Sequence, residues 1–295
     1  MKFSIDTIRA RRSVRTYDGE PLSKEEREAL LASFAETLPT PFGTKPRFAL
    51  VGADPDGRPL RMGTYGLISG AGAYVVGAAS LRDGGMEDFG YAMEGIVLRA
   101  TELGLGSCWL GGIFDRGRSA RVLGLGEGEV VAAALSLGRP AAKPSLQERL
   151  VYGASGARGR KPHAELFFAA TKDGARALTP WSAIPADSPW LARPRAELLE
   201  AIRIGPSASN KQPWRLLLED ARGSSGPALH LYLHEDRAYN NALGDVKIQR
   251  MDMGIAMRHA EVAAAALGLP GAWTRLDPPP FEAPAPRSYV ASFLA

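Results

Sequence analysis

The chain has 295 residues, of which 45% are hydrophobic and 23% are charged, so it is long and apolar enough to fold around a substantial core. The net charge of +4 suits an anionic ligand, and the lack of a zinc finger, helix-turn-helix or aromatic RNA-binding motif argues against nucleic-acid binding. A single cysteine, Cys108, excludes an internal disulfide framework, and the longest weakly polar run, residues 70–81, is too short to span a membrane. Because the N-terminus lacks an apolar signal core, we expect a cytoplasmic protein.

The first predicted element is a short helix over residues 3–10, which a basic segment containing Arg11, Arg12, Ser13 and Arg15 follows. In an extended chain alternate side chains point the same way, so Arg11, Ser13 and Arg15 would share one face. Two guanidinium groups and a hydroxyl on one face would suit a phosphate dianion, because arginine offers paired donors to its oxygens. These residues alone also fit a solvated basic turn.

The rest of the first half predicts alternating helices and strands. Ser23 and Glu26 match a capping box and predict a helix that runs to about Glu36. Apolar residues at helical or strand spacing then predict four further elements, namely a strand over 47–53, a strand over 73–79, a helix over 88–103 and a strand over 130–137.

Residues 139–163 differ in composition from what precedes them. They are rich in basic residues, glycine and proline, and Arg158 and Arg160 stand shortly before Pro162. The segment fits either a charged surface linker or a phosphate clamp.

The second half of the sequence repeats the first. The motif Asp-Phe-Gly-Tyr-Ala-Met at Asp88 matches Asp-Met-Gly-Ile-Ala-Met at Asp252, 164 positions later, and at the same offset Trp109 matches Trp273. Several matches in the same order at nearly constant offset indicate a duplicated fold. We therefore predict two similar halves, residues 1–165 and residues 166–295, packed as one unit.

Two corresponding loops show that the halves are not equivalent. Loops 39–46 and 206–213 each run between prolines seven positions apart and each follows an amphipathic helix. The second loop carries hydroxyl and amide side chains that suit a flat hydrogen-bonding ligand, and the first loop lacks the amides. Conversely, the basic segment at residues 11–15 has no counterpart in the second half. Each half therefore retains a different part of a site, which predicts one composite pocket between them.

These motifs resemble those of the nitroreductase family of FMN-dependent oxidoreductases. The most specific match is Pro-Ser-x-x-Asn-x-Gln-Pro-Trp at residues 206–214. The family's Arg-x-Ser-x-basic element is matched at residues 11–15, and its Gly-Leu-Gly-Ser-x-Trp-x-Gly segment at residues 104–111. The basic pair that grips the phosphate in the family is matched by Arg158 and Arg160. The resemblance covers most of residues 8–275.

The resemblance implies an α+β, three-layer nitroreductase-like fold. Together with the repeat, it implies the branch of the family in which one polypeptide of two fused halves, a pseudo-dimer, replaces the usual homodimer. We therefore expect a monomer with one FMN per chain. The implied reaction is ping-pong reduction of a nitroaromatic, quinone or similar electron-poor acceptor, with NADH or NADPH as the donor.

The residues that the resemblance implies for FMN binding are Arg11, Arg12, Ser13, Arg15, Trp109, Leu110, Gly111, Gly112, Arg158, Arg160, Pro206, Ser207, Ser209, Asn210 and Gln212. The basic residues and Ser13 would hold the phosphate and ribityl chain. Ser207, Asn210 and Gln212 would contact the isoalloxazine, and the two glycines would let backbone N–H groups approach its N5 edge.

Because flavin supplies the redox chemistry, the chain needs neither a catalytic side chain nor a metal cluster. The four histidines are scattered, and we expect His230 and His234 at the surface and Cys108 as a small packed residue. Two alternatives stay open. One is a different flavin reaction on the same fold, such as dehalogenation or ene reduction, and the other is a degenerate flavin-binding or sensor protein without turnover.

Overall fold

The structure is a computed structural model. It describes residues 2–52, 62–64, 66–143, 145, 148, 159–169, 179–180, 188–220, 226–277 and 287–294. Arg158 and the proline-rich segment at residues 278–286 lie outside these ranges.

The first half folds around a four-stranded sheet whose pairings are all antiparallel, in the order β1-β2-β4-β3. Its strands are β1 (Arg47–Val51), β2 (Ala73–Ser80), β3 (Gly106–Leu110) and β4 (Glu129–Gly138). Helices α2 (Lys24–Glu36) and α3 (Gly85–Glu102) pack on one face, α4 (Arg116–Leu123) packs on the other, and α1 (Ile5–Ala10) lies against α3. β2 and β4 are almost wholly buried because helices cover both faces of the sheet.

The second half repeats this topology. Its sheet has the order β6-β5-β7-β8-β10-β9, and the run β7-β8-β10-β9 follows the same pattern as β1-β2-β4-β3. The strands are β5 (Phe167–Ala169), β6 (Thr179–Pro180), β7 (Trp214–Glu219), β8 (Ala228–His234), β9 (Ala272–Thr274) and β10 (Arg287–Leu294). The repeated strand order confirms the duplicated fold. The boundary near residue 165 stays a prediction, which the parallel pairing of β5 with β7 supports.

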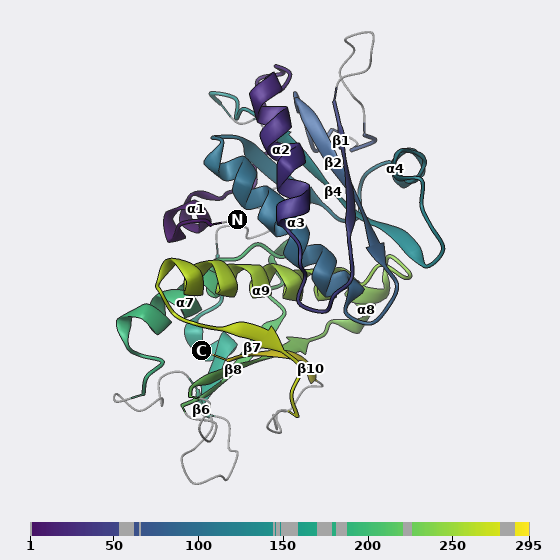
Figure 1. The fold of residues 1–295 in the computed structure, drawn as a ribbon. Helices are drawn as coiled ribbons and strands as arrows, with labels where there is room; N and C mark the ends of the chain where they lie inside the picture. The colour runs from purple at the N-terminus through teal and green to yellow at the C-terminus, as the bar shows by residue number, and fades with distance from the viewer. Residues whose placement is uncertain are drawn as a thin grey trace.

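The remaining α-helices of the described part of the chain are α6 (His163–Leu166), at the predicted boundary between the halves, and α7 (Arg193–Arg203), α8 (Arg237–Asn241) and α9 (Ile248–Ala266) of the second half. Helices α3 and α9 pack against each other between the two sheets (Figure 1). Two glycines allow their close approach. A methyl group at Gly90 would collide with the Met251 carbonyl, and one at Gly254 would collide with the Glu87 carbonyl. Gly254 lies 164 positions after Gly90, so the two contacts are related by the repeat.

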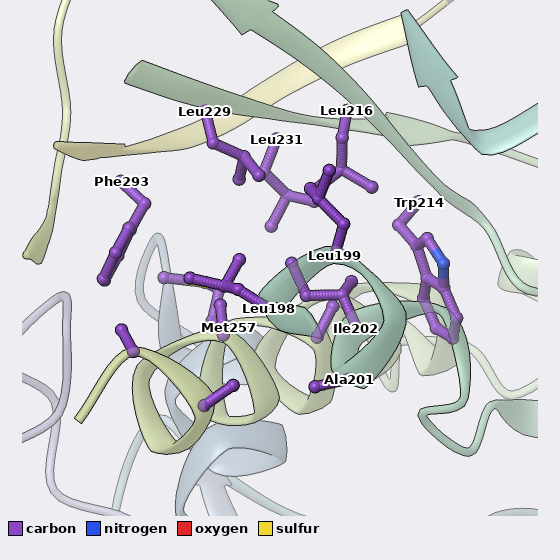
Figure 2. Packing of buried hydrophobic residues seen from close by; sticks show 14 of the residues in the cluster. Leu198, Leu199, Ala201, Ile202, Trp214, Leu216, Leu229, Leu231, Met257 and Phe293 are labelled. Carbon is purple, nitrogen blue, oxygen red and sulfur yellow. The ribbon is translucent and has the colours of Figure 1, made fainter. Parts of the chain in front are cut away.

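The largest apolar cluster lies between the second sheet and helices α7 and α9 (Figure 2). Leu198, Leu199 and Ile202 of α7 are fully buried there against Leu216 of β7 and Leu229 of β8. This face follows from the sequence of α7, in which apolar residues recur at helical spacing.

Several predicted elements are confirmed. Ser23 and Glu26 form both hydrogen bonds of the capping box, and α2 ends at Glu36 as predicted. One expectation is wrong, because His230 is fully buried in β8 and not at the surface. Its ring nitrogens contact Ser292 Oγ at 2.7 Å and Glu219 Oε2 at 3.1 Å, so partners on both neighbouring strands satisfy a polar side chain in the core.

Candidate active site

A cavity of about 310 Å³ lies between the two halves. It is bounded by the segment after α1, by β3 and the turn that follows it, by the loop after α7 and by the first turns of α9. The residues that line it are Ser13, Arg15, Leu67, Ile68, Cys108, Trp109, Leu110, Gly111, Gly112, Ile113, Ala133, Pro206, Ser207, Ala208, Ser209, Tyr239, Ile248, Met251, Asp252 and Ile255. The structure thus brings segments nearly 200 positions apart in sequence to one site, as the composite-pocket prediction requires.

The segment after α1 forms one wall. Ser13 pairs with Ser107 in an isolated parallel bridge, which fixes the segment beside β3. The backbone N–H of Arg15 donates to Glu148 Oε1 at 3.1 Å, and both Ser13 and Arg15 line the cavity. Arg12, which precedes Ser13, is exposed and does not line the cavity.

Three arginines gather near this wall. Arg11 and Arg15 both lie close enough to Cys108 to act on its thiol electrostatically. Burial, and after it the nearby Arg11 and Arg203 guanidiniums, lower the pKa of Arg160 from its ordinary value. Arg160 also donates to Asn210 Oδ1 and to the Ile204 carbonyl, each at 3.1 Å. A cluster of like charges at one end of a cavity suits an anionic group.

The loop after α7 forms the opposite wall through Pro206, Ser207 and Ser209. Its backbone is held in an uncommon conformation, with φ of 47° at Ser209, 54° at Asn210 and 48° at Gln212. Side chains other than glycine rarely adopt this left-handed region, so such residues cluster where surrounding contacts hold them.

The two amides of this loop do not line the cavity. The Lys161 backbone N–H donates to Gln212 Oε1 at 2.8 Å, and Asn210 Nδ2 donates to the Gly159 carbonyl at 2.9 Å. The amides therefore tie the loop to residues 159–161 and hold Arg160. A direct bond from either amide to a flavin ring stays a prediction.

The third wall is the segment from Trp109 to Gly112, all four residues of which line the cavity. Gly111 lies against Ile248 of α9, and a methyl group there would collide with that side chain. Gly112 faces open space. Gly112 therefore leaves its backbone accessible, whereas Ile248 fills the space beside Gly111. The approach of N–H groups to a ring at these positions stays a prediction.

A buried polar chain supports Trp109 from behind. Its indole N–H donates to Glu94 Oε2 at 2.9 Å, and Glu94 Oε1 contacts His259 Nε2 at 2.9 Å. His259 Nδ1 lies 2.8 Å from the Ala201 carbonyl, which only accepts, so that nitrogen carries a proton. Glu94 of α3 and His259 of α9 are both fully buried, and their contact fixes the two central helices and the cavity wall together.

Cys108 is a buried residue of this wall. Burial raises the pKa of its thiol, although the Arg15 and Arg11 guanidiniums act in the opposite direction. A thiol with a raised pKa is a poor nucleophile at neutral pH, which agrees with the expectation of a small packed residue.

Several cavity residues escaped the sequence prediction. Tyr239 of α8 lines the cavity, and its hydroxyl lies 2.8 Å from Ser209 Oγ. Ile248, Met251 and Asp252 come from the start of α9. The repeat placed Asp252 opposite Asp88 in the alignment of the halves, but sequence alone contains no signal that this turn of the helix faces a pocket.

A second cleft, of about 370 Å³, lies at the position related to the first by the repeat. Tyr91 and Trp273 line it at the positions that correspond to Ile255 and Trp109 of the first cavity. The Arg258 guanidinium lies 3.7 Å from the centre of the Tyr91 ring and donates to the Tyr91 and Thr37 carbonyls, each at 3.1 Å. A stacked arginine and tyrosine therefore occupy part of this cleft.

A comparison with protein families matches residues 4–264 to the family described as "Putative TM nitroreductase". The chain belongs to this family. The nitroreductase family predicted from the sequence motifs is thereby confirmed, and the family is one of oxidoreductases. A search of curated proteins found no significant match.

Some solved structures are similar to the whole of this nitroreductase-family chain, and others are similar to about half of it. A nitroreductase from Thermotoga maritima is similar over 100% of this chain and 94% of its own, with 16% identity and a TM-score of 0.58, which confirms the fold. A nitroreductase from Bacteroides fragilis, described with bound FMN, matches 48% of this chain and 90% of its own, with 24% identity and a TM-score of 0.38. One from Desulfovibrio desulfuricans, described in complex with FMN, matches 55% of this chain and 92% of its own, with 25% identity and a TM-score of 0.42.

Two further findings concern the described part of this nitroreductase-family chain. Its helices are all too short or too polar to cross a membrane. Within the same residues, histidine, cysteine and acidic side chains nowhere form a group of three or more that could hold a metal ion.

Proposed function

We propose that the protein is an FMN-dependent oxidoreductase that binds one FMN in the cavity between its halves. It would use NADH or NADPH to reduce nitroaromatic, quinone or similar electron-poor acceptors. The carrying observation is that the cavity joins Ser13 and Arg15 of the first half to Pro206–Ser209 of the second, with Arg11 and Arg160 grouped beside it.

The residues present fit this cofactor. FMN is a planar, mostly apolar ring with polar edges and an anionic tail. The cavity combines the apolar side chains of Leu110, Ile248 and Ile255 with backbone exposed at Gly112. Beside it, the Nε atom of Arg11 is buried and has no hydrogen-bond partner among the described residues. An orphaned guanidinium donor in a cluster of arginines fits a phosphate.

Bound FMN would supply the redox chemistry, a two-electron transfer from the nicotinamide donor to the acceptor. The chain's own residues would bind and orient. Arg11, Arg15 and Arg160 would hold the phosphate, and Ser13 and Ser207 would bond the polar edges of the cofactor. The buried link from Glu94 to the Trp109 indole would keep that wall in place. Backbone N–H groups near Gly111 and Gly112 would stabilise negative charge that develops on the ring.

The second cleft supports a stoichiometry of one FMN per chain. Arg258 lies over Tyr91 within it, and the chain offers no second basic segment equivalent to residues 11–15. A ring would have to displace a buried guanidinium from two backbone carbonyls, which costs free energy that no phosphate contact offsets.

The test is to load the purified protein with FMN and measure the ratio of flavin to protein and the oxidation of NADH and NADPH. We expect a yellow protein with one FMN per chain that consumes nicotinamide when a quinone or nitroaromatic is present. Two FMN per chain would contradict the single site. A loaded protein that oxidises neither donor would indicate a flavin-binding protein without turnover.

A further inference from the structure

Asp252 stands on the wall of the cavity at the start of α9, and only 2% of its surface is exposed. Its Oδ1 atom accepts a hydrogen bond from the Ala208 backbone N–H at 2.9 Å. Its Oδ2 atom is buried and has no hydrogen-bond partner among the described residues. An unpaired buried carboxyl oxygen is costly, so a ligand that fills the cavity is the natural source of its partner.

The corresponding aspartate of the first half shows what has changed. Asp88 accepts from the Phe42 N–H at 2.9 Å through Oδ1, and through Oδ2 from the Thr44 N–H and Thr44 hydroxyl at 2.8 Å each. Both of its oxygens therefore hold the loop of its own half. The loop of the second half bonds Asp252 through Ala208 alone. The same helix position thus has a purely structural role in one half and a spare polar atom beside the cavity in the other.

Resting on the proposed function, we propose that Asp252 is a neutral carboxylic acid whose Oδ2–H group donates a hydrogen bond to an acceptor atom of the bound flavin ring. A neutral acid suits this place because it accepts through one oxygen and donates through the other. Burial supports this state, since it raises the pKa of Asp252 well above its ordinary value, against the opposing effect of the Ala208 hydrogen bond.

Other ionisable groups surround Asp252. Those on the neighbouring elements are Arg15 and Cys108 across the cavity, Tyr239 from α8, and the ion pair between Glu87 of α3 and Arg250 of α9. Burial raises the pKa of both the Cys108 thiol and the Tyr239 hydroxyl, so these two groups stay neutral at neutral pH. Asp252 is therefore the acidic side chain among the cavity-lining residues.

Two variants test the proposal, with the dissociation constant for FMN measured from quenching of flavin fluorescence. Asp252→Asn keeps an oxygen to accept from Ala208 and an N–H to donate, so we expect affinity within about twofold of wild type. Asp252→Leu has similar size and neither group, so we expect affinity to fall about tenfold or more. The reduction potential of bound FMN should also fall in Asp252→Leu, because a donor to the ring stabilises its reduced, more electron-rich form.

The pH dependence adds a separate measurement. As pH rises through the raised pKa of Asp252, the acid loses its proton, and a buried negative charge replaces the donor. Wild type should therefore lose FMN affinity with rising pH relative to Asp252→Asn, which cannot ionise. The second ionisation of the FMN phosphate, near pH 6, affects both proteins and cancels in their ratio.

Asp88→Leu is the matched control, since it removes the same side chain from the loop of the other half. It should destabilise the FMN-free protein in chemical unfolding and leave FMN affinity unchanged. If Asp252→Leu binds FMN as tightly as wild type and at the same potential, Oδ2 bonds an ordered water and the proposal is wrong. If Asp252→Asn is as weak as Asp252→Leu, the neutral-donor role is wrong. A wild type that binds no FMN contradicts this proposal and the proposed function together.

Discussion

At the scale of single residues, the arginines near the cavity differ in their surroundings. Arg15 lines the cavity and acts on the buried Cys108, whereas Arg12, three positions earlier, is exposed and lines nothing. Sequence alone could not separate these two side chains, because both fit a phosphate clamp and a solvated turn equally. The difference arises from the bridge between Ser13 and Ser107, a contact across more than 90 positions.

We expect Arg15→Ala to weaken FMN binding by about 1.5–3 kcal/mol, the range for a hydrogen bond to a charged group. Arg12→Ala is the matched control and should leave the FMN dissociation constant nearly unchanged. Riboflavin, which lacks the phosphate, should bind Arg15→Ala and wild type with similar affinity. Equal FMN affinity of Arg15→Ala and wild type would contradict the phosphate-binding role and favour the interpretation of this segment as a solvated basic turn.

Other side chains show where sequence patterns are insufficient. The loop from Pro206 to Pro213 lines the cavity through residues that include Ser207 and Ser209, and its role in binding a flavin stays a prediction. The amides are used differently, since Asn210 and Gln212 bond residues 159–161. His230 was placed wrongly because its partners, Ser292 and Glu219, become neighbours only when the sheet forms.

At the scale of elements, this loop is a strained connection held by its amides. Left-handed backbone at Asn210 and Gln212 costs on the order of 1–3 kcal/mol each, and persists because surrounding contacts compensate. Those contacts also fix Arg160, so the loop connects the cavity wall to the proposed phosphate end of the site.

We therefore expect the double change Asn210→Ala and Gln212→Ala to lower FMN affinity, even though neither amide lines the cavity. The loss should be larger for FMN than for riboflavin, because Arg160, once released, would no longer be held in place to bind the phosphate, which riboflavin lacks. Lys211→Ala serves as the control, since its ammonium group bonds the exposed Asp236 instead. Titration of each folded variant with both ligands measures the difference, and an unchanged FMN affinity would contradict the composite site.

The crossing of α3 and α9 is a second feature at this scale. Because a methyl group at Gly254 would meet the Glu87 carbonyl, Gly254→Ala must push the helices apart. We expect a loss of about 1–3 kcal/mol in the free energy of unfolding, measured with chemical denaturant. Gly112→Ala is the control, because a methyl group at Gly112 would face open space. Gly268 is unsuitable as a control, because its φ of 67° would strain an alanine whatever the surrounding space. A Gly254→Ala protein as stable as wild type would show that the crossing adjusts freely.

At the scale of the whole molecule, the duplication was readable from sequence because repeated motifs keep their order and offset. Local signals such as the capping box at Ser23 were likewise sufficient for individual helices. Helix α4 was not predicted from the sequence, although Asp115 caps its start and Gly124 ends it. Most of its residues are polar or small, so apolar residues do not recur in it at a clear helical spacing. The partial filling of the second cleft could not be predicted, since it depends on a stack between Tyr91 and Arg258 on different helices.

The contact between Glu94 and His259 has a consequence for how such a molecule can change over time. The repeat places Arg258 opposite Glu94 and Gly95 opposite His259. In an assembly of two identical chains, every mutation appears in both copies. Corresponding positions would then carry the same residue, so Glu94 and Arg258, or Gly95 and His259, could not differ. Joining both copies in one gene removes that restriction. One copy can then acquire an acid–imidazole contact behind its cavity wall, while in the other a stacked arginine and tyrosine fill part of the corresponding cleft.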